Sequence, residues 1–427
     1  MNKIIRAAYG AETMYQNLSF EAIEIWEEWN RYIAAGGDLP PGMTSRDEIW
    51  VNNGNLQICD SDRLPPFETR SIKNMEKAGK RHTQVVVTNP EDVEQAERSG
   101  FAFAVDPFHR VGRSKPYQAL LDTSGGFVYA DRACRLALHL CRQAGVKFWL
   151  GRAGEFQAFI SDRLGNITGV HTADGERLKA KLTIVAGGGW TQQMVPELDG
   201  LCETTAGSVA VVEIPKSSPL FDRFAPHNFP TWTYKMRDGA AGGLYGFPRD
   251  DNGLLKFGYR GVKYTNPQPH RSVPVTRWTK PASITRVPLE ALTRIRGFIK
   301  EFLPEIGEAG LDISFTRLCW YNDSFDNHFV IDSVPKRPGL MVATGGSGHA
   351  FMFFPNIGKY VADRVEGNDQ CLLDHWKWRS LAPDQKPVNK LMEGLQGARA
   401  LQNQPLYRDD DLRLQDESSN VSLKPRL

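Results

Sequence analysis

Three segments near the C-terminal end of the chain decide the fold: LCWYND at 318–323, HFVID at 328–332 and MVATGGSGHAFM at 341–352. The apolar run 341–344 predicts a short buried strand. Gly345, Gly346 and Gly348 follow this run and allow a ligand to approach the backbone closely. A helix predicted from this turn to Glu366 begins with free N–H groups and the positive end of its dipole, which favour a phosphate or an anionic ring. The turn therefore predicts a site for a flat, anionic cofactor; the alternative is a tight strand-to-helix turn that binds no ligand.

Composition narrows the class of protein. The chain has 427 residues, of which 41% are hydrophobic and 24% charged, so it is long enough for one large or two medium domains with a packed core. A net charge of +2 gives no electrostatic basis for binding nucleic acid or a membrane surface. No apolar run is long enough for a membrane span, and no apolar signal region opens the chain. Six cysteines without zinc-ligand spacing indicate reduced intracellular thiols, and we expect no metal site.

The three segments together form a more specific pattern. In chain order they contain Cys319, Tyr321, His328-Phe329, Ile331-Asp332, Gly345 and Ser347-Gly348-His349. This pattern resembles the C-terminal part of the sarcosine oxidase and fructosyl-amino-acid oxidase (amadoriase) branch of FAD-dependent amine oxidases, within the D-amino-acid-oxidase-like superfamily. The resemblance runs from Asn2 to about Gly367. It implies an α/β (α+β) fold in which a Rossmann-like layer binds FAD and an antiparallel-sheet domain binds the substrate.

The N-terminal end departs from this pattern. The resemblance implies a strand, a GxGxxG turn and a helix that hold the FAD pyrophosphate, followed by an acidic residue that binds the ribose. The sequence opens with MNKIIRAAYG at 1–10, a segment that follows this unit in the resembling family. We therefore expect an N-terminally truncated FAD-binding layer that lacks its first βαβ unit.

A second glycine cluster, at 187–189, follows another predicted strand. Gln192 stands where a dinucleotide fingerprint has its third glycine. The cluster resembles instead the V-x-x-G-x-W pattern of the same family, which implies that Gly187, Gly188 and Trp190 lie along the adenosine side of FAD. The alternative is a structural turn.

Periodicity and resemblance divide the chain into two interleaved domains and an extension. Helices are predicted across 18–33, 129–144 and 288–302, and strands across 56–59, 84–87 and 147–150, among others. Cys134 and Cys141 lie seven residues apart on one predicted helix, where we expect them to pack in the core. The FAD-binding domain is assigned to 1–60, 125–205 and 312–370, the substrate domain to 61–124 and 206–311, and a C-terminal extension to 371–427. The tail from Asp409 to Leu427 is expected to be solvated.

Cys319 is the candidate attachment site for the cofactor. The resemblance implies a thioether between its sulfur and the 8α carbon of the flavin ring, whereas a cysteine considered alone more commonly packs in a core. The resemblance also implies that Lys3 approaches the flavin. It further implies a cradle for the cofactor formed by Gly345, Gly346, Ser347, Gly348, His349 and Met352.

Two residues are candidates for the chemical step. The resemblance places Lys263 over the reactive face of the flavin, where its positive charge stabilises developing superoxide as oxygen is reduced. The alternative is a surface lysine beside a turn. Tyr321 matches an active-site tyrosine two residues after the attachment cysteine, and its alternative is an ordinary core aromatic.

The substrate site is predicted at Arg6, Tyr259 and Met352. Arg6 matches an arginine that holds the substrate carboxylate through a two-pronged contact; the alternative is a surface basic residue. Met352 stands where the resembling family has a second carboxylate-binding lysine. We therefore expect a substrate that relies on Arg6 alone or lacks a carboxylate at that point, which disfavours sarcosine. A bulkier or aromatic secondary amine is favoured by the aromatic residues expected nearby, Trp232, Tyr245, Tyr259 and Trp320.

The sequence thus predicts an FAD-dependent oxidoreductase that converts a secondary amine or N-substituted amino acid to an imine and reduces oxygen to hydrogen peroxide. Two alternatives stay open: a non-catalytic or unstable truncated relative that does not retain FAD, and a flavin dehydrogenase that uses another electron acceptor. We expect a monomer in the cytoplasm or the peroxisome, because the terminal Pro425-Arg426-Leu427 weakly resembles a peroxisomal tripeptide.

Overall fold

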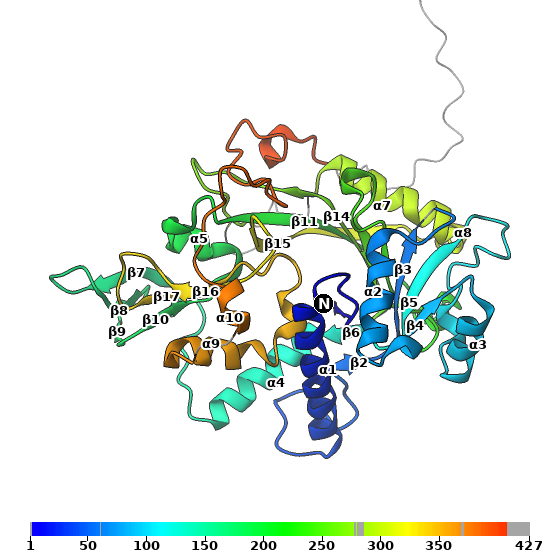
Figure 1. Ribbon diagram of the computed structural model, residues 1–427, viewed down its shortest axis with the longest axis horizontal. Helices are drawn as coiled ribbons and strands as arrows, with labels where there is room; N and C mark the ends of the chain where they lie inside the picture. Colours follow the sequence, from blue (N-terminus) through cyan, green and yellow to red (C-terminus); the bar gives the residue numbers. More distant parts are fainter. Residues whose placement is uncertain (1, 60, 277–278, 280–285, 369–370, 408–427) are drawn as a thin grey trace, which may run out of the picture.

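The computed structural model describes residues 2–59, 61–276, 279, 286–368 and 371–407, and it has a mixed α/β fold (Figure 1). The strands are β1 (Asn2–Ile5), β2 (Trp50–Val51), β3 (Asn55–Cys59), β4 (Gln84–Val86), β5 (Gln118–Asp122), β6 (Gly126–Tyr129), β7 (Phe156–Ser161), β8 (Ile167–Thr172), β9 (Arg177–Lys179), β10 (Thr183–Val185), β11 (Cys202–Glu213), β12 (Thr231–Tyr234), β13 (Leu244–Gly246), β14 (Leu254–Tyr264), β15 (Ile313–Ser324), β16 (Val330–Ser333) and β17 (Leu340–Thr344). The helices are α1 (Thr13–Ala34), α2 (Pro66–Lys77), α3 (Pro90–Arg98), α4 (Ala130–Gln143), α5 (Thr191–Met194), α6 (Leu220–Arg223), α7 (Leu289–Phe302), α8 (Pro304–Glu308), α9 (Ile357–Glu366) and α10 (Cys371–His375).

An eight-stranded sheet dominates the molecule. Its strand order is β15-β11-β14-β13-β12-β3-β5-β4, and it curves across the upper part and the right side of Figure 1. Most pairs are antiparallel, but β12 pairs with β3 in parallel, so the sheet is mixed. The pairing also revises the predicted domain boundaries. Strands β3 and β15, which the sequence analysis assigned to the FAD-binding domain, belong to this sheet.

Side-chain alternation gives β14 two different faces. Successive side chains of a strand point to opposite sides of the sheet. Leu255, Phe257 and Tyr259 are buried in the largest apolar core of the molecule. Lys256 and Arg260, at the intervening positions, line a cavity on the other side. The large sheet therefore separates an apolar core from a cavity into which β14 places two cationic side chains.

Helix α7 supplies much of the core side of this sheet. Its buried residues recur at helical spacing, and they include Ile295, Phe298 and Phe302. The Trp232 ring stacks on the Phe298 ring with 4.4 Å between centroids and 10° between planes. Trp232 is fully buried on this side. It is therefore a core residue, in contrast to its predicted place near the substrate.

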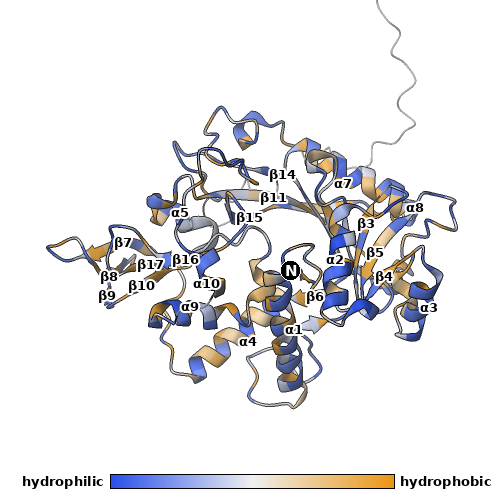
Figure 2. Ribbon diagram, in the orientation of Figure 1, coloured by the Kyte–Doolittle hydropathy of each residue, from blue (hydrophilic) through white to orange (hydrophobic). Residues whose placement is uncertain are grey.

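A smaller sheet with the order β10-β17-β16 contains parts of two of the three opening segments, HFVID and MVATGGSGHAFM, whereas LCWYND lies in β15 of the large sheet. β10 runs parallel to β17, and β16 pairs with β17 in the antiparallel direction. Both β10 and β17 are coloured as hydrophobic in Figure 2, whereas α2 and α3 are mostly hydrophilic. The strand predicted at 341–344 is thus confirmed as part of β17. The helix predicted directly after the glycine turn begins later, at Ile357, because a short 3₁₀ segment (Ala350–Phe353) intervenes.

One edge of β10 carries no partner among the described strands. Ile184 on this strand is 39% exposed. The strand predicted at 147–150 does not form either, and Trp149 and Leu150 there are exposed. A strand needs a neighbouring strand for its backbone hydrogen bonds, and none of the described residues provides one for this segment.

Cys134 and Cys141 of α4 are exposed, so the prediction that they pack in the core is wrong.

The N-terminal strand β1 belongs to a separate three-stranded sheet with the order β1-β6-β2. β1 pairs with β6, and α1 packs against the segment that follows β17. The indole nitrogen of Trp26 in α1 donates a hydrogen bond of 3.1 Å to the backbone oxygen of Met352. At the start of α3, the side chain of Asn89 accepts a hydrogen bond from the backbone of Glu91 and caps the helix. None of the described helices has the length and apolarity needed to cross a membrane.

Residues 371–407, the described part of the predicted C-terminal extension, pack onto the molecule. Trp376 is fully buried, and its backbone oxygen accepts a hydrogen bond from Ile331 of β16. Arg379 makes a two-pronged contact with Asp326, with both N–O distances 2.7 Å. The remainder of the predicted extension, 408–427, lies outside the described residues.

We expect the variant Trp376→Ala to lower the free energy of unfolding by about 3–5 kcal/mol, which is typical when a buried aromatic side chain is removed. The indole packs against Tyr15 and Phe329 and donates a hydrogen bond to the Tyr15 hydroxyl. Urea unfolding followed by tryptophan fluorescence measures the change. The control is Val388→Ala in the same segment, because Val388 is 67% exposed. Equal stability of the two variants would contradict the packed C-terminal segment.

Candidate active site

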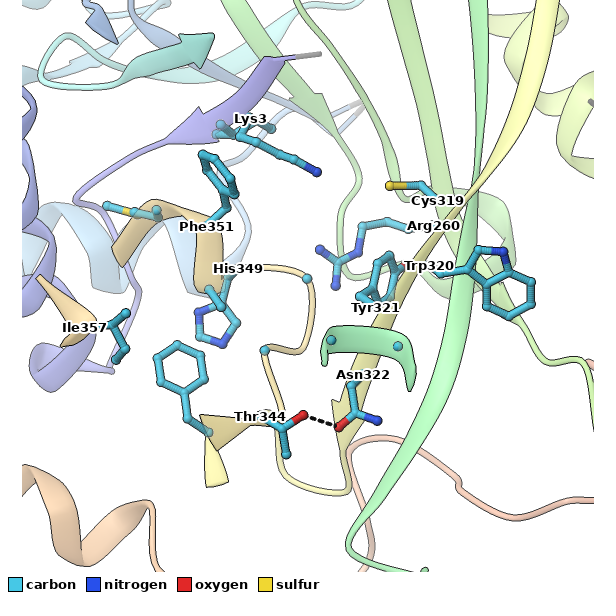
Figure 3. A pocket seen from close by; sticks show the side chains of 18 of the residues that line it. Lys3, Arg260, Cys319, Trp320, Tyr321, Asn322, Thr344, His349, Phe351 and Ile357 are labelled. Carbon is cyan, nitrogen blue, oxygen red and sulfur yellow. Dashed lines mark hydrogen bonds between the residues drawn. The ribbon is translucent and has the colours of Figure 1, made fainter. Parts of the chain in front are cut away.

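A cavity of about 660 Å³ lies between the small sheet, the N-terminal segment and the polar face of the large sheet. Its floor comes from β12, β13, β14 and β15, and its opposite wall comes from the glycine turn after β17. Figure 3 shows Lys3 and Arg260 directed into the space in front of Cys319 and Tyr321. No acidic residue lines this cavity within the described chain, whereas five cationic residues do: Lys3, Arg6, Arg237, Lys256 and Arg260. The cavity is therefore suited to anions.

Cys319 lies at the cationic end of the cavity. Burial alone would raise the pKa of its thiol, but the positive charges of Lys3, Lys256 and Arg317 outweigh burial and lower this pKa below its usual range. A lower pKa increases the thiolate fraction, which is the nucleophilic form. The structure thus places Cys319 and Lys3 together, as the sequence predicted, and gives the sulfur a reactive environment.

Lys256 is a site residue that the sequence analysis missed. It is 6% exposed, and its Nζ donates a hydrogen bond of 2.9 Å to the backbone oxygen of Asn2. Burial, together with the charges of Lys3 and Arg317, lowers its pKa to about 7. A signal was present in the sequence, since LLKFGYR at 254–260 alternates apolar and cationic residues, but only the sheet shows which face meets the cavity.

Lys263 lies apart from the residues that line the cavity. Its Nζ is 2.8 Å from a carboxylate oxygen of Asp323 and 2.9 Å from the side-chain oxygen of Asn389. An ion pair fixes this charge behind Tyr321 and partly neutralises it. Lys263 thus holds its charge in an ion pair outside the cavity lining, whereas Lys256 of the same strand is a lining residue.

Tyr321 lines the cavity, as predicted. Its hydroxyl is buried without a partner among the described residues, and burial raises its pKa well above the usual range. Tyr259 lies on the other side of the sheet, where its hydroxyl donates a hydrogen bond of 2.9 Å to the backbone oxygen of Ala240. Alternation along β14 explains this correction, because Tyr259 shares a face with the core residue Phe257. Of the other aromatics expected near the substrate, Tyr245 and Trp320 line the cavity.

Arg6 and Met352 both line the cavity. The Arg6 guanidinium lies 4.7 Å from the centre of the Tyr9 ring and donates one hydrogen bond to the backbone oxygen of Ala8. Met352 is 3% exposed, and its sulfur accepts a hydrogen bond of 3.5 Å from the Tyr9 hydroxyl. Arg6 therefore offers charge to a ligand, whereas Met352 offers an apolar surface.

The glycine turn after β17 exposes backbone to the cavity at Gly346 and Gly348. His349 also lines the cavity, and its Nε2 lies 3.1 Å from the backbone oxygen of Asn327, so this nitrogen donates. Burial lowers the pKa of His349 to about 3, which keeps the ring neutral. The other predicted members, Gly345 and Ser347, stand behind the turn, where the Ser347 hydroxyl donates to the Gly345 oxygen at 3.0 Å.

Asn322 braces this turn and was missed by the sequence analysis. Its side-chain oxygen accepts a hydrogen bond of 3.0 Å from the Thr344 hydroxyl (Figure 3). The same oxygen accepts a hydrogen bond of 3.3 Å from the Gly345 backbone.

On the other side of the cavity, Gly188 is a lining residue as predicted. Gly187 and Trp190 are not lining residues, and Trp190 is 36% exposed.

These residues fit the ring end of a flavin. The unpartnered Tyr321 hydroxyl, the bare backbone at Gly346 and Gly348, and two cations beside a reactive thiol match a flat ring that becomes anionic on reduction. The N-terminal end of α9 also lines the cavity through Ile357 and Gly358 and favours a phosphate. No carboxylate for a ribose lines the cavity within the described chain.

Comparison with protein families decides the assignment. A family model described as DAO, FAD dependent oxidoreductase, matches residues 2–364. The chain belongs to the DAO family of FAD-dependent oxidoreductases. FAD is therefore its cofactor class, and the predicted family and reaction class are confirmed. Covalent attachment of FAD and the specific substrate are separate questions.

Individual relatives of this DAO-family chain carry names of amine-oxidising enzymes. L-saccharopine oxidase from Schizosaccharomyces pombe is 26% identical over 401 residues, which cover 89% of this chain and 83% of the relative. N-methyl-L-tryptophan oxidase from Escherichia coli K12 is 26% identical over 367 residues, which cover 84% and 82%. A modified fructosyl peptide oxidase from Aspergillus nidulans shares the fold, with a TM-score of 0.76, 23% identity, and coverage of 96% of this chain and 88% of that one. The predicted fold class is thus confirmed.

Proposed function

We propose that this DAO-family protein oxidises a secondary amine or N-substituted amino acid to an imine and reduces oxygen to hydrogen peroxide. In this reaction the C–H and N–H hydrogens beside the new C=N bond leave the substrate, and one O₂ molecule takes up both with their two electrons. The observation that carries the proposal is one cavity that joins Cys319, Lys3 and Lys256 to Arg6. The two relatives are named as oxidases of saccharopine and N-methyl-L-tryptophan, and these names support an N-substituted amino acid as the substrate.

FAD, when bound, accepts a hydride equivalent from the carbon beside the nitrogen and passes two electrons to oxygen. Arg6 binds the carboxylate of the substrate and orients that carbon. Since no acidic residue lines the cavity within the described chain, nothing there stabilises a protonated amine, and the substrate reacts as the free amine. Lys256 supplies positive charge where negative charge develops on oxygen, and Tyr321 offers its unpartnered hydroxyl as a hydrogen-bond donor.

We further propose that Cys319 holds FAD through a thioether. Formation of the C–S bond removes one hydrogen from the thiol and one from the ring's methyl carbon, and oxygen takes up both. The thiolate favoured by Lys3 and Lys256 is suited to form this bond. We predict that acid precipitation leaves the flavin absorbance with the wild-type pellet and releases it into the supernatant for Cys319→Ala. The control Cys141→Ala, an exposed cysteine on α4, should behave as the wild type. Flavin release from the wild type would remove the thioether.

The function is tested by mixing the purified protein anaerobically with saccharopine or N-methyl-L-tryptophan and recording the flavin absorbance before and after oxygen is admitted. The proposal expects bleaching by an amine and recovery with oxygen, accompanied by hydrogen peroxide. Bleaching without recovery in oxygen would favour the dehydrogenase alternative. A folded, colourless protein would favour the non-catalytic alternative. Monomeric state and peroxisomal location stay predictions, and 425–427 lies outside the described residues.

A further inference from the structure

Three arginines that line the cavity, Arg6, Arg237 and Arg260, lie near one another. Arg6 and Arg237 both lie over the Phe67 ring, with 5.9 Å and 3.0 Å from guanidinium carbon to ring centre. Arg260 extends from β14 and donates to the backbone oxygen of Ser347 at 3.4 Å. Burial, together with the charges of Arg6 and Arg260, lowers the pKa of Arg237. These guanidiniums therefore act on one another and form a single cationic cluster.

The cluster carries more charge than its protein partners neutralise. Arg6 and Arg260 form no ion pair with an acidic group of the described chain, and Arg237 pairs with Glu68 at 3.2 Å. Three positive charges and one negative charge leave a local charge of +2. A guanidinium has five N–H donors, and Glu68 engages one Arg237 nitrogen, Nη1. One substrate carboxylate would leave one positive charge uncompensated, whereas two carboxylates would balance the cluster.

Gln57 adds a second, independent feature. It lies on β3 beside Thr233 of β12, and both residues line the same cavity as Arg237. Gln57 is 5% exposed, and its side-chain nitrogen has no hydrogen-bond partner within the described chain. A buried amide donor without a partner costs free energy unless a ligand accepts its hydrogen bond. An anionic oxygen beside Arg237 would do so.

We infer that the substrate carries a second acidic group on its N-substituent, and that Arg237, Arg260 and Gln57 bind this group while Arg6 binds the amino-acid carboxylate. The substrate class is then an N-(carboxyalkyl) amino acid, a secondary amine with at least two carboxylates. This inference rests on the proposed function. It restricts the earlier expectation of a bulky or aromatic amine, because the N-substituent must end in a group that accepts hydrogen bonds from arginine.

Binding can be measured without turnover. The probe is a thioether dicarboxylic acid, in which sulfur replaces the amine nitrogen so that no imine can form. The comparison compound is the monoamide of the same acid, in which an amide replaces the carboxylate on the side of the N-substituent. Calorimetric titration of the purified holoprotein gives both dissociation constants. We expect the dicarboxylate to bind about 10- to 100-fold more tightly than the monoamide, as charge-assisted hydrogen bonds typically contribute.

Variants test whether the arginine cluster causes the preference for the dicarboxylate over the monoamide. Arg237→Gln should reduce the preference for the dicarboxylate to within about threefold, and Gln57→Leu should reduce it in part. The control is Arg70→Gln, because Arg70 is exposed and lies near Arg237 without lining the cavity. An equal affinity of wild-type protein for both probes, or an unchanged preference in both Arg237→Gln and Gln57→Leu, would overturn the inference. If Arg237→Gln does not fold, Gln57→Leu still tests the inference.

Amine oxidation is measured in a separate experiment, by anaerobic bleaching of the flavin. Anaerobic bleaching of the flavin by neutral N-alkyl amino acids, combined with equal affinity for the two probes, would overturn the second acidic subsite and leave the proposed function in place. A strong preference for the dicarboxylate probe without bleaching by any amine would support the subsite and contradict the proposed function.

Discussion

Replacing Lys256 by methionine is expected to slow the reaction of the reduced enzyme with oxygen by about 100- to 1,000-fold, the usual effect of removing one group that stabilises developing charge. Methionine keeps the length of the side chain and removes its charge. Because Arg6 and the substrate side of the cavity are unchanged, reduction of the flavin by the amine should change far less. Stopped-flow absorbance, with the reduced enzyme mixed against buffers of known oxygen content, measures the step directly.

The matched control is Lys263→Met on the same strand. Lys263 pairs with Asp323 and does not line the cavity, so we expect less than a threefold change in the reaction with oxygen. Some loss of stability is expected, because Asp323 would lose its cation. The opposite result, a large effect for Lys263→Met and a small one for Lys256→Met, would restore the role that the sequence suggested for Lys263.

The same step should depend on pH in wild-type protein. A lysine is charged below its pKa, and burial lowers the pKa of Lys256 to about 7. The reaction with oxygen should therefore become slower as pH rises through 7 or above, since a negative ring beside Lys256 favours its charged form. This dependence should be absent from Lys256→Met.

The variant Arg6→Gln is expected to lower kcat/KM for a carboxylated amine by about 100- to 1,000-fold, the loss of a two-pronged, charge-assisted contact in a cavity. The Arg6 guanidinium is held by the Tyr9 ring and the Ala8 oxygen, so it is already oriented before a ligand binds. Steady-state peroxide production across substrate concentrations provides the measurement.

Two comparisons make this result specific. Arg6→Lys keeps the charge and loses the two-pronged geometry, so we expect an intermediate loss. A decarboxylated amine of the same shape should react poorly with wild type and should lose little more with Arg6→Gln. If both substrates lost the same factor in Arg6→Gln, Arg6 would have a structural role rather than the proposed one.

The features predicted correctly from sequence are local ones. The strand of β17, the exposed backbone at Gly346 and Gly348, and the cavity positions of Cys319 and Tyr321 all follow from short contiguous patterns. Such a pattern predicts which residues lie near a turn from the neighbouring sequence alone.

The features that were missed depend on distant parts of the chain. Lys256 and Arg260 meet the cavity only because β14 lies between β11 and β13 with one particular face toward it. Arg237 reaches the site because β12 pairs with β3, which is far away in sequence. The predicted strand at 147–150 is the converse case, since its apolar composition is typical of a strand but no described strand pairs with it.

Strand β14 has a consequence for how this protein could diversify. Loss or gain of a single residue within 254–260 would shift the alternation by one position and exchange the two faces. Lys256 and Arg260 would then enter the apolar core, while Phe257 and Tyr259 would enter the cavity. Changes of specificity in this strand are therefore restricted to substitutions. The exposed residues 251–252 in the turn before β14 can accept insertions without altering that phase.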